Sequence, residues 1–124
     1  MSAFVISKRP GGDYKFTFAS RKGKTIFTSI ACKQKSDCEV MINAIQEDTT
    51  NFTFSKKRTG GGKYFFRISR NGLVLATSRK FTTELMLQKG IDQILKYVPV
   101  AETLDFSESE DIFAEADSPA EVQM

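Results

Sequence analysis

The sequence predicts an α+β fold of two tandem repeats, each a three-stranded antiparallel meander followed by a helix, with the repeats related by a pseudo-twofold axis. One observation is a phrase that occurs twice: Ser20-Arg21-Lys22-Gly23 precedes Thr28-Ser29, and Ser69-Arg70-Asn71-Gly72 precedes Thr77-Ser78. Both glycines and both Thr-Ser pairs are 49 residues apart. In addition, each half alternates apolar and polar residues before changing to a helical period. One half of the chain therefore copies the other.

The first half begins with three predicted strands. Phe4-Val5-Ile6 starts the first strand, and Pro10-Gly11-Gly12 is a turn signal. Residues 13–19 place Tyr14, Phe16 and Phe18 in alternation with Asp13, Lys15, Thr17 and Ala19, which is typical of a half-buried strand. Residues 21–24 read as a hairpin turn in which Gly23 adopts positive φ, and residues 26–28 form the third strand. Short turns between the strands predict an antiparallel meander.

A helix follows these strands. Ser36-Asp37-Cys38-Glu39 fits a capping box with Ser36 as N-cap, and the helix runs to about Glu47. Its apolar residues recur at helical spacing: Cys38, Met41, Ile42 and Ile45. Residues 49–51 separate the two repeats.

The second half repeats this order with small shifts. Residues 52–57 match residues 4–9 at an offset of 48, and a turn longer by two residues at 58–62 brings Tyr64, Phe66 and Ile68 to an offset of 50. Asn71-Gly72 is a strong hairpin signal that restores the offset of 49 before the strand Leu73–Thr77. Length changes of this kind are tolerated in turns.

The second helix is expected from about Thr83 to Tyr97, with Pro99 ending it. Its expected apolar side consists of Leu87, Ile91, Ile94 and Leu95. Gly90 stands inside this helix at a cost of about 1 kcal/mol against Ala, which suggests a close approach to a neighbouring element. The two three-stranded sheets are expected either to pack together or to join edge to edge.

Charge divides the chain into two parts. Residues 1–99 hold all 18 Lys and Arg and only seven acids, a net charge of +11, whereas residues 100–124 hold eight acids and no base. We expect residues 1–99 to form a single domain of two repeats (about 3–48 and 51–98). Residues 100–124 are expected to be an acidic C-terminal tail, partly disordered or docked.

Composition argues against several classes of function. No histidine is present, which removes the commonest general base and metal ligand, and no acidic pair recurs at a spacing typical of catalysis. Cys32 and Cys38 give neither a CxxC pair nor a disulfide framework, and we expect Cys38 to be a small buried hydrophobe. No apolar run approaches the length of a membrane-spanning helix. We expect a cytoplasmic, non-enzymatic protein with no catalytic residue, no cofactor and no metal site.

The residues also resemble a known family. The segments that carry the resemblance are Gly12 to Phe18, Lys22-Gly23, Ile26 to Ser29 and Met41 to Ile45 in the first half, and Gly62 to Ile68, Asn71-Gly72, Thr77-Ser78 and Gly90 to Ile94 in the second. Together they are similar to the YegP-like family of uncharacterised small bacterial proteins. The resemblance covers about residues 4–97 and implies tandem α+β repeats, with single-repeat relatives that dimerise. The family's aromatic after the Thr-Ser segment is kept as Phe81 but replaced by Cys32, and no functional residue transfers.

The excess of basic residues predicts candidate polyanion-binding positions: Lys8, Arg9, Arg21, Lys22, Lys56, Lys57, Arg58, Lys63, Phe65 and Arg67. Phe65 points opposite to Tyr64 and Phe66 in an extended strand, so an exposed Phe65 beside Lys63 and Arg67 favours stacking on bases. A phosphate-loop interpretation of residues 59–63 fails, because the motif's first glycine and its Ser or Thr are absent and a strand follows.

The tail predicts a second candidate site, for partner docking, at Leu104, Phe106, Ile112 and Phe113. It can fold back on the basic body, bind a partner, or be disordered. We therefore predict a non-catalytic binding or interaction module with a basic body and an acidic-hydrophobic tail. The alternative is a weak nucleic-acid or polyanion binder regulated by the tail. The expected partner is an unknown protein or a polyanion, without membrane association, and the chain is a monomer with internal pseudo-symmetry or a homodimer.

Overall fold

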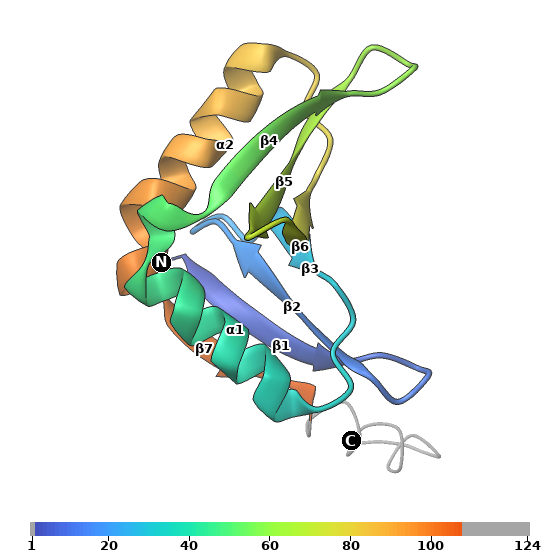
Figure 1. The fold of residues 1–124 in the computed structure, drawn as a ribbon, viewed down its shortest axis with the longest axis vertical. Helices are drawn as coiled ribbons and strands as arrows, with labels where there is room; N and C mark the ends of the chain where they lie inside the picture. The colour runs from blue at the N-terminus through green and yellow to red at the C-terminus, as the bar shows by residue number, and fades with distance from the viewer. Residues whose placement is uncertain (1, 108–124) are drawn as a thin grey trace.

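The computed structural model describes residues 2–107 and consists of one seven-stranded mixed sheet with two α-helices (Figure 1). The elements, in chain order, are β1 (Ala3–Lys8), β2 (Tyr14–Ala19), β3 (Thr25–Ser29), α1 (Lys35–Glu47), η1 (Thr49–Asn51), β4 (Thr53–Arg58), β5 (Tyr64–Arg70), β6 (Leu73–Ser78), α2 (Glu84–Tyr97), η2 (Val98–Val100) and β7 (Glu102–Asp105). The predicted α+β class is confirmed.

The strand order is β4-β5-β6-β3-β2-β1-β7, so the two groups of three strands join edge to edge where β3 pairs with β6. That contact is antiparallel and places Thr28 opposite Thr77. β7 pairs in parallel with β1, so the sheet includes residues beyond position 99. β4 lies at the opposite edge of the sheet from β7.

The strand register corrects the expected offset at the start of the second half. Phe4 lies opposite Phe18 in the β1–β2 pair, and Phe54 lies opposite Ile68 in the β4–β5 pair. Phe54 is therefore the counterpart of Phe4, an offset of 50 rather than 48. The following turns also have the same length and the same internal hydrogen bonds, from Gly12 N to Arg9 O and from Gly62 N to Thr59 O. The expected two-residue insertion is wrong, because Phe54 rather than Phe52 occupies the position that Phe4 has in the first half.

The next hairpin turns confirm the sequence interpretation. Gly23 has φ +84°, while Asn71 and Gly72 have φ +54° and +80°. Positive φ at both central residues allows the tight turn that Asn-Gly favours. The turn after β5 is therefore one residue shorter, which accounts for the return to an offset of 49 at Thr77.

The first helix begins earlier than predicted. Its N-cap is Gln34 rather than Ser36, and the Asp37 carboxylate accepts a hydrogen bond from the Gln34 backbone N–H at 3.4 Å. Asp37 rather than Glu39 takes this role, because Asp37 lies three residues after Gln34, whose backbone is extended as an N-cap requires. In α2, which begins close to its expected start, the N-cap is Thr83, whose side chain accepts from the Met86 N–H at 3.1 Å.

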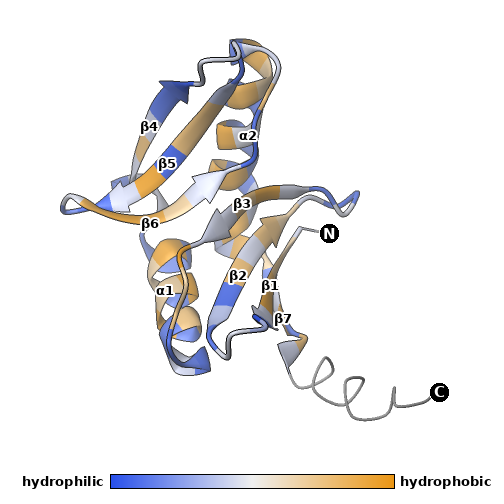
Figure 2. Cartoon of the chain, turned by 90° about the vertical axis from the view of Figure 1, so that its right-hand side faces the viewer, coloured by the Kyte–Doolittle hydropathy of each residue, from blue (hydrophilic) through white to orange (hydrophobic). Residues whose placement is uncertain are grey.

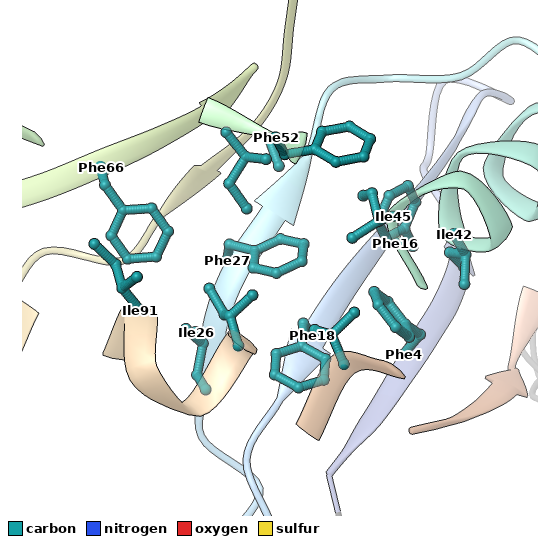
Figure 3. Close-up of a cluster of buried hydrophobic side chains, with 14 of the residues drawn as sticks. Phe4, Phe16, Phe18, Ile26, Phe27, Ile42, Ile45, Phe52, Phe66 and Ile91 are labelled. Carbon is teal, nitrogen blue, oxygen red and sulfur yellow. The ribbon is translucent and has the colours of Figure 1, made fainter. Parts of the chain in front are cut away.

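The core lies between the sheet and the helices, which cover the same face (Figures 1 and 3). Figure 2 shows apolar and polar residues alternating along the strands. Phe27 lies between Phe66 of the second half and Phe18 of the first in Figure 3, so one core extends across the β3–β6 junction. Leu95, expected on the apolar side of α2, is 41% exposed, which corrects that expectation: it lies on the rim of the buried stripe.

The serines of the repeated Thr-Ser phrase are part of this core. Ser29 Oγ accepts from Phe16 N at 2.9 Å and donates to Ile30 O at 2.8 Å. Ser78 does the same with Phe66 N and Arg79 O. Each serine satisfies two backbone groups where a strand leaves the sheet, so the repeated phrase has a structural role.

Candidate anion-binding pocket

The predicted basic residues do not form one surface. Lys8 and Arg9 lie in the β1–β2 hairpin, whereas Lys56, Lys57, Arg58 and Lys63 lie in the β4–β5 hairpin. These hairpin turns stand at opposite ends of the molecule (Figure 1). Several of the charges also have local partners: Arg9 Nε is 3.5 Å from Asp13 Oδ1, and Lys56 Nζ donates to Gln88 Oε1 at 2.8 Å.

Phe65 points away from the buried Phe66, as expected, but it is only half exposed. The Arg67 guanidinium lies 5.6 Å from the centre of the Phe65 ring, and Lys57 is opposite Phe65 in the register. The Arg67 side chain therefore already occupies one side of the Phe65 ring. The structure therefore offers one partly covered ring here rather than an open row of aromatic side chains.

Arg21 and Lys22, in contrast, line a pocket of about 410 Å³ between the β2–β3 hairpin and α2. Three further basic residues line the same pocket: Lys24, Arg79 and Lys89. No Asp or Glu belongs to its lining, and no ion pair within residues 2–107 engages any of these five side chains. We call this site the hairpin–helix pocket; its remaining lining residues are Ser2, Ser20, Ile26, Phe81, Met86, Gly90, Gln93 and Tyr97.

The hairpin–helix pocket also has apolar walls. Ile26 and Phe81 are each 4% exposed, and Met86 is 42% exposed. The Arg79 guanidinium lies 4.5 Å from the centre of the Phe81 ring, which fixes this cation beside the apolar wall. Cationic and apolar groups therefore face the same space.

The candidate residues predicted from the sequence include Arg21 and Lys22 of this lining but not Lys24, Arg79 or Lys89. Lys24 belongs to the same turn as Arg21 and Lys22, from which Gly23 alone separates it in the sequence. Lys89, Gly90 and Gln93 lie on one side of α2 at helical spacing, but this signal becomes informative only once the hairpin is known to face that side.

The cysteines behave as structural residues. Cys38 is fully buried, as expected. Burial, together with a hydrogen bond to Cys32, raises the pKa of the Cys38 thiol to about 12, so it is protonated at neutral pH. Within the described residues, no group of three or more His, Cys, Asp or Glu side chains is placed to hold a metal ion.

Two of the four predicted docking residues are described. Leu104 is half-buried in β7, and Phe106 is 47% exposed. Ile112 and Phe113 lie outside the described residues. Asp105 anchors β7: it accepts from Ser107 Oγ at 2.6 Å and pairs with Lys35 Nζ at 2.9 Å, and these contacts lower the Asp105 pKa.

No family model matches the chain. Individual relatives do: a UPF0339 protein encoded 5′ of the ptx operon in Stutzerimonas stutzeri is 24% identical over 104 residues, covering 82% of this chain and 94% of the relative. YegP of Escherichia coli K12 is 24% identical over 93 residues, covering 73% of this chain and 84% of YegP.

Solved structures show the same fold. A UPF0339 protein from Shewanella oneidensis superposes with a TM-score of 0.76 at 18% identity, covering 86% of this chain and 92% of that one. YegP from E. coli, a protein of unknown function, superposes with a TM-score of 0.75 at 20% identity, covering 86% and 93%. The chain is thus a small α+β protein with a seven-stranded mixed sheet and two helices, matching UPF0339 structures. Its resemblance to the YegP-like family of uncharacterised proteins is confirmed.

In the part of the chain that the structure covers, neither helix has the length and apolar character needed to cross a membrane.

Proposed function

We propose that this protein is a non-catalytic binding module that holds an anionic ligand in the hairpin–helix pocket. The observation that carries the proposal is the gathering of five basic side chains around one pocket without a carboxylate in its lining. Surface charges of a soluble protein are ordinarily mixed in sign, so a concave site lined by one sign concentrates ions of the opposite sign.

The architecture that supports this site is, we propose, a duplicated unit with a pseudo-twofold axis through the Thr28–Thr77 pair. These threonines are equivalent in the two halves and lie opposite each other. The flanking pairs, Phe27 with Ser78 and Ser29 with Ala76, exchange under a half-turn when residues 49 apart are treated as equivalent. The β2–β3 hairpin of one copy thereby faces the helix of the other.

The binding proposal is tested by titrating the full chain with pyrophosphate at low salt and following backbone amide shifts by NMR. We expect shifts at Lys22, Lys89 and Gly90, which diminish as salt screens the charges. Lys89→Glu should weaken binding about tenfold, because it replaces an attraction by a repulsion at a few ångströms from the anion.

The matched control is Lys63→Glu, which makes the same change of charge in the β4–β5 hairpin, outside the pocket. It should leave pyrophosphate affinity nearly unchanged. Equal weakening by the two variants would mean that net charge alone attracts the anion, and the absence of any binding would refute the proposed function.

The acidic tail is proposed to compete with the ligand for the basic body. Residues 108–124 hold six acids and no base. Neutralising three of them in the full chain (Glu108→Gln, Glu110→Gln and Asp111→Asn) should tighten pyrophosphate binding at low salt and have little effect at high salt. Unchanged affinity at low salt would contradict competition by the tail.

A further inference from the structure

The fold contains an internal comparison for the hairpin–helix pocket. Under the proposed pseudo-twofold, the corresponding place lies between the β5–β6 hairpin and α1. Register equates Ser2 with Phe52, because Phe4 and Phe54 occupy matching positions in β1 and β4. The offset of 49 after the hairpins equates Tyr97 with Asp48.

The space between the β5–β6 hairpin and α1 is filled by a side chain, and the positive charge beside it is neutralised by a carboxylate. The Phe52 side chain is only 5% exposed, and the Arg70 guanidinium lies 5.1 Å from the centre of its ring. Arg70 also pairs with Asp48, with Nη2 3.1 Å from Oδ2. A large ring and an ion pair thus occupy the space between hairpin and helix in the second site.

The hairpin–helix pocket differs at each of these positions. Ser2 replaces the Phe52 ring with a small side chain, and Tyr97 replaces the carboxylate of Asp48. Two of its cations also have apolar counterparts, because Arg79 corresponds to Ile30 and Lys89 to Val40. The pocket is therefore not a by-product of joining a hairpin to a helix in this fold; its open volume and its positive charge are specific to one of the two sites.

We infer that the hairpin–helix pocket takes a small phosphorylated molecule with an apolar body, an inference that rests on the proposed function and specifies its ligand. The apolar body occupies the space that Phe52 fills in the other half, against Ile26, Met86 and Tyr97. The phosphate lies toward Lys22, Lys24 and Lys89 at the rim. A volume of about 410 Å³ is within the range of small-molecule sites, which lie between about 300 and 1,000 Å³.

Five cations favour a doubly charged phosphate over a single carboxylate. The same chemistry occurs in molecules with an aromatic body and in molecules with an alkyl chain. Naphthyl phosphate and octyl phosphate represent these two sources, and inorganic phosphate represents the anion without an apolar body.

The test compares the affinities of these three probes for the full chain by NMR titration at one salt concentration. Both organic phosphates are expected to shift the amides of Lys22 and Gly90, and at least one should bind about tenfold tighter than inorganic phosphate, since apolar burial contributes about 25 cal/mol per Å². Tighter binding of naphthyl phosphate assigns the aromatic source, and tighter binding of octyl phosphate assigns the alkyl source.

Ser2→Phe tests the location of the apolar body. The added ring places in this pocket the side chain that the other half holds as Phe52, so the fold has a precedent for it. The variant should abolish the tenfold preference for the organic phosphates while inorganic phosphate still binds. Thr50→Phe adds an equal ring at an exposed position outside the pocket and should keep the preference. Thermal unfolding of both variants verifies that each is folded.

The outcomes separate the two proposals. Equal affinity for all three probes would overturn the inference about the apolar body and leave anion binding intact. A preference that survives in Ser2→Phe would place the apolar body elsewhere and also overturn it. If none of the three probes binds, the proposed function itself fails.

Discussion

Gly90 shows how a single residue makes room for a large neighbouring side chain within the second half. A Cβ at this position would lie 2.9 Å from Phe81 Cζ, which is closer than van der Waals contact. Phe81 has little freedom to move, because its ring stacks on the Phe66 ring with the two centroids 6.2 Å apart. The Arg79 guanidinium also lies 4.5 Å from the centre of the Phe81 ring. In the first half the smaller Cys32 takes the place of Phe81, and Met41 takes the place of Gly90.

Gly90→Ala should therefore destabilise the protein despite the better helix propensity of alanine. Overpacking costs about 1–3 kcal/mol and propensity returns about 1 kcal/mol, so we expect a net loss of about 1 kcal/mol in urea unfolding. Gly60→Ala is the control, because no atom lies within 4 Å of its added Cβ and its φ is not positive. Equal stability of wild type and Gly90→Ala would show that Phe81 moves aside easily.

Cys38 gives a second prediction at the scale of the residue. Its pKa of about 12 leaves almost no thiolate at pH 8, and the side chain is fully buried. We expect iodoacetamide to modify Cys38 at least a hundredfold more slowly in the native protein than in urea, as measured by mass spectrometry of the labelled peptide. Rapid modification of the native protein at this position would mean that the region around α1 opens readily.

At the scale of the element, the attachment of β7 depends in part on a titrating group. Asp105 has a lowered pKa because it accepts from Ser107 and pairs with Lys35. A carboxyl group with a lowered folded-state pKa adds stability above its unfolded pKa of about 3.9, and this contribution disappears as pH falls through the folded pKa. Both side chains are about one-third exposed, so the contribution is small.

Asp105→Asn should lower the free energy of unfolding by less than about 1 kcal/mol at pH 7. The difference from wild type should shrink toward zero when urea unfolding is repeated near pH 2.5. Thr103→Ser, on the same strand, should show no such pH dependence. A difference that persists at low pH would point to a contribution of Asp105 other than its charge.

The elements were predictable from the sequence wherever a local pattern determined them. Alternation gave the strands of residues 13–19 and 64–68, and positive φ at Gly23, Asn71 and Gly72 followed from turn chemistry. The start of α1 was misplaced because Asp37 and Glu39 both suit a capping box, and only the backbone of Gln34 decides between them. β7 was not predicted as a strand, because a parallel partner distant in sequence, β1, stabilises it.

At the scale of the whole molecule, the hairpin–helix pocket was beyond sequence reasoning for a similar reason. Its walls come from Ser2, the β2–β3 hairpin and α2, so it exists only after both halves have joined at β3–β6. The excess of basic residues was visible, but Arg21 and Lys89 are 68 positions apart and nothing local relates them. Under the proposed pseudo-twofold the two sites between hairpin and helix are unequal, because Ser2 stands in one where Phe52 stands in the other.

The shared core predicts that the two halves unfold as one unit. Phe27 is fully buried and lies within 6.4 Å, centroid to centroid, of Phe4, Phe16 and Phe18, while β3 pairs with β6 of the other half. Phe27→Ala should cost about 3–5 kcal/mol. Because unfolding of one half removes core from the other, native-state hydrogen exchange should accelerate to the same extent at Phe18 of β2 and at Ile68 of β5. Leu73→Ala, at a side chain that is 62% exposed, should accelerate neither. Faster exchange confined to β2 would mean that each half is stable on its own.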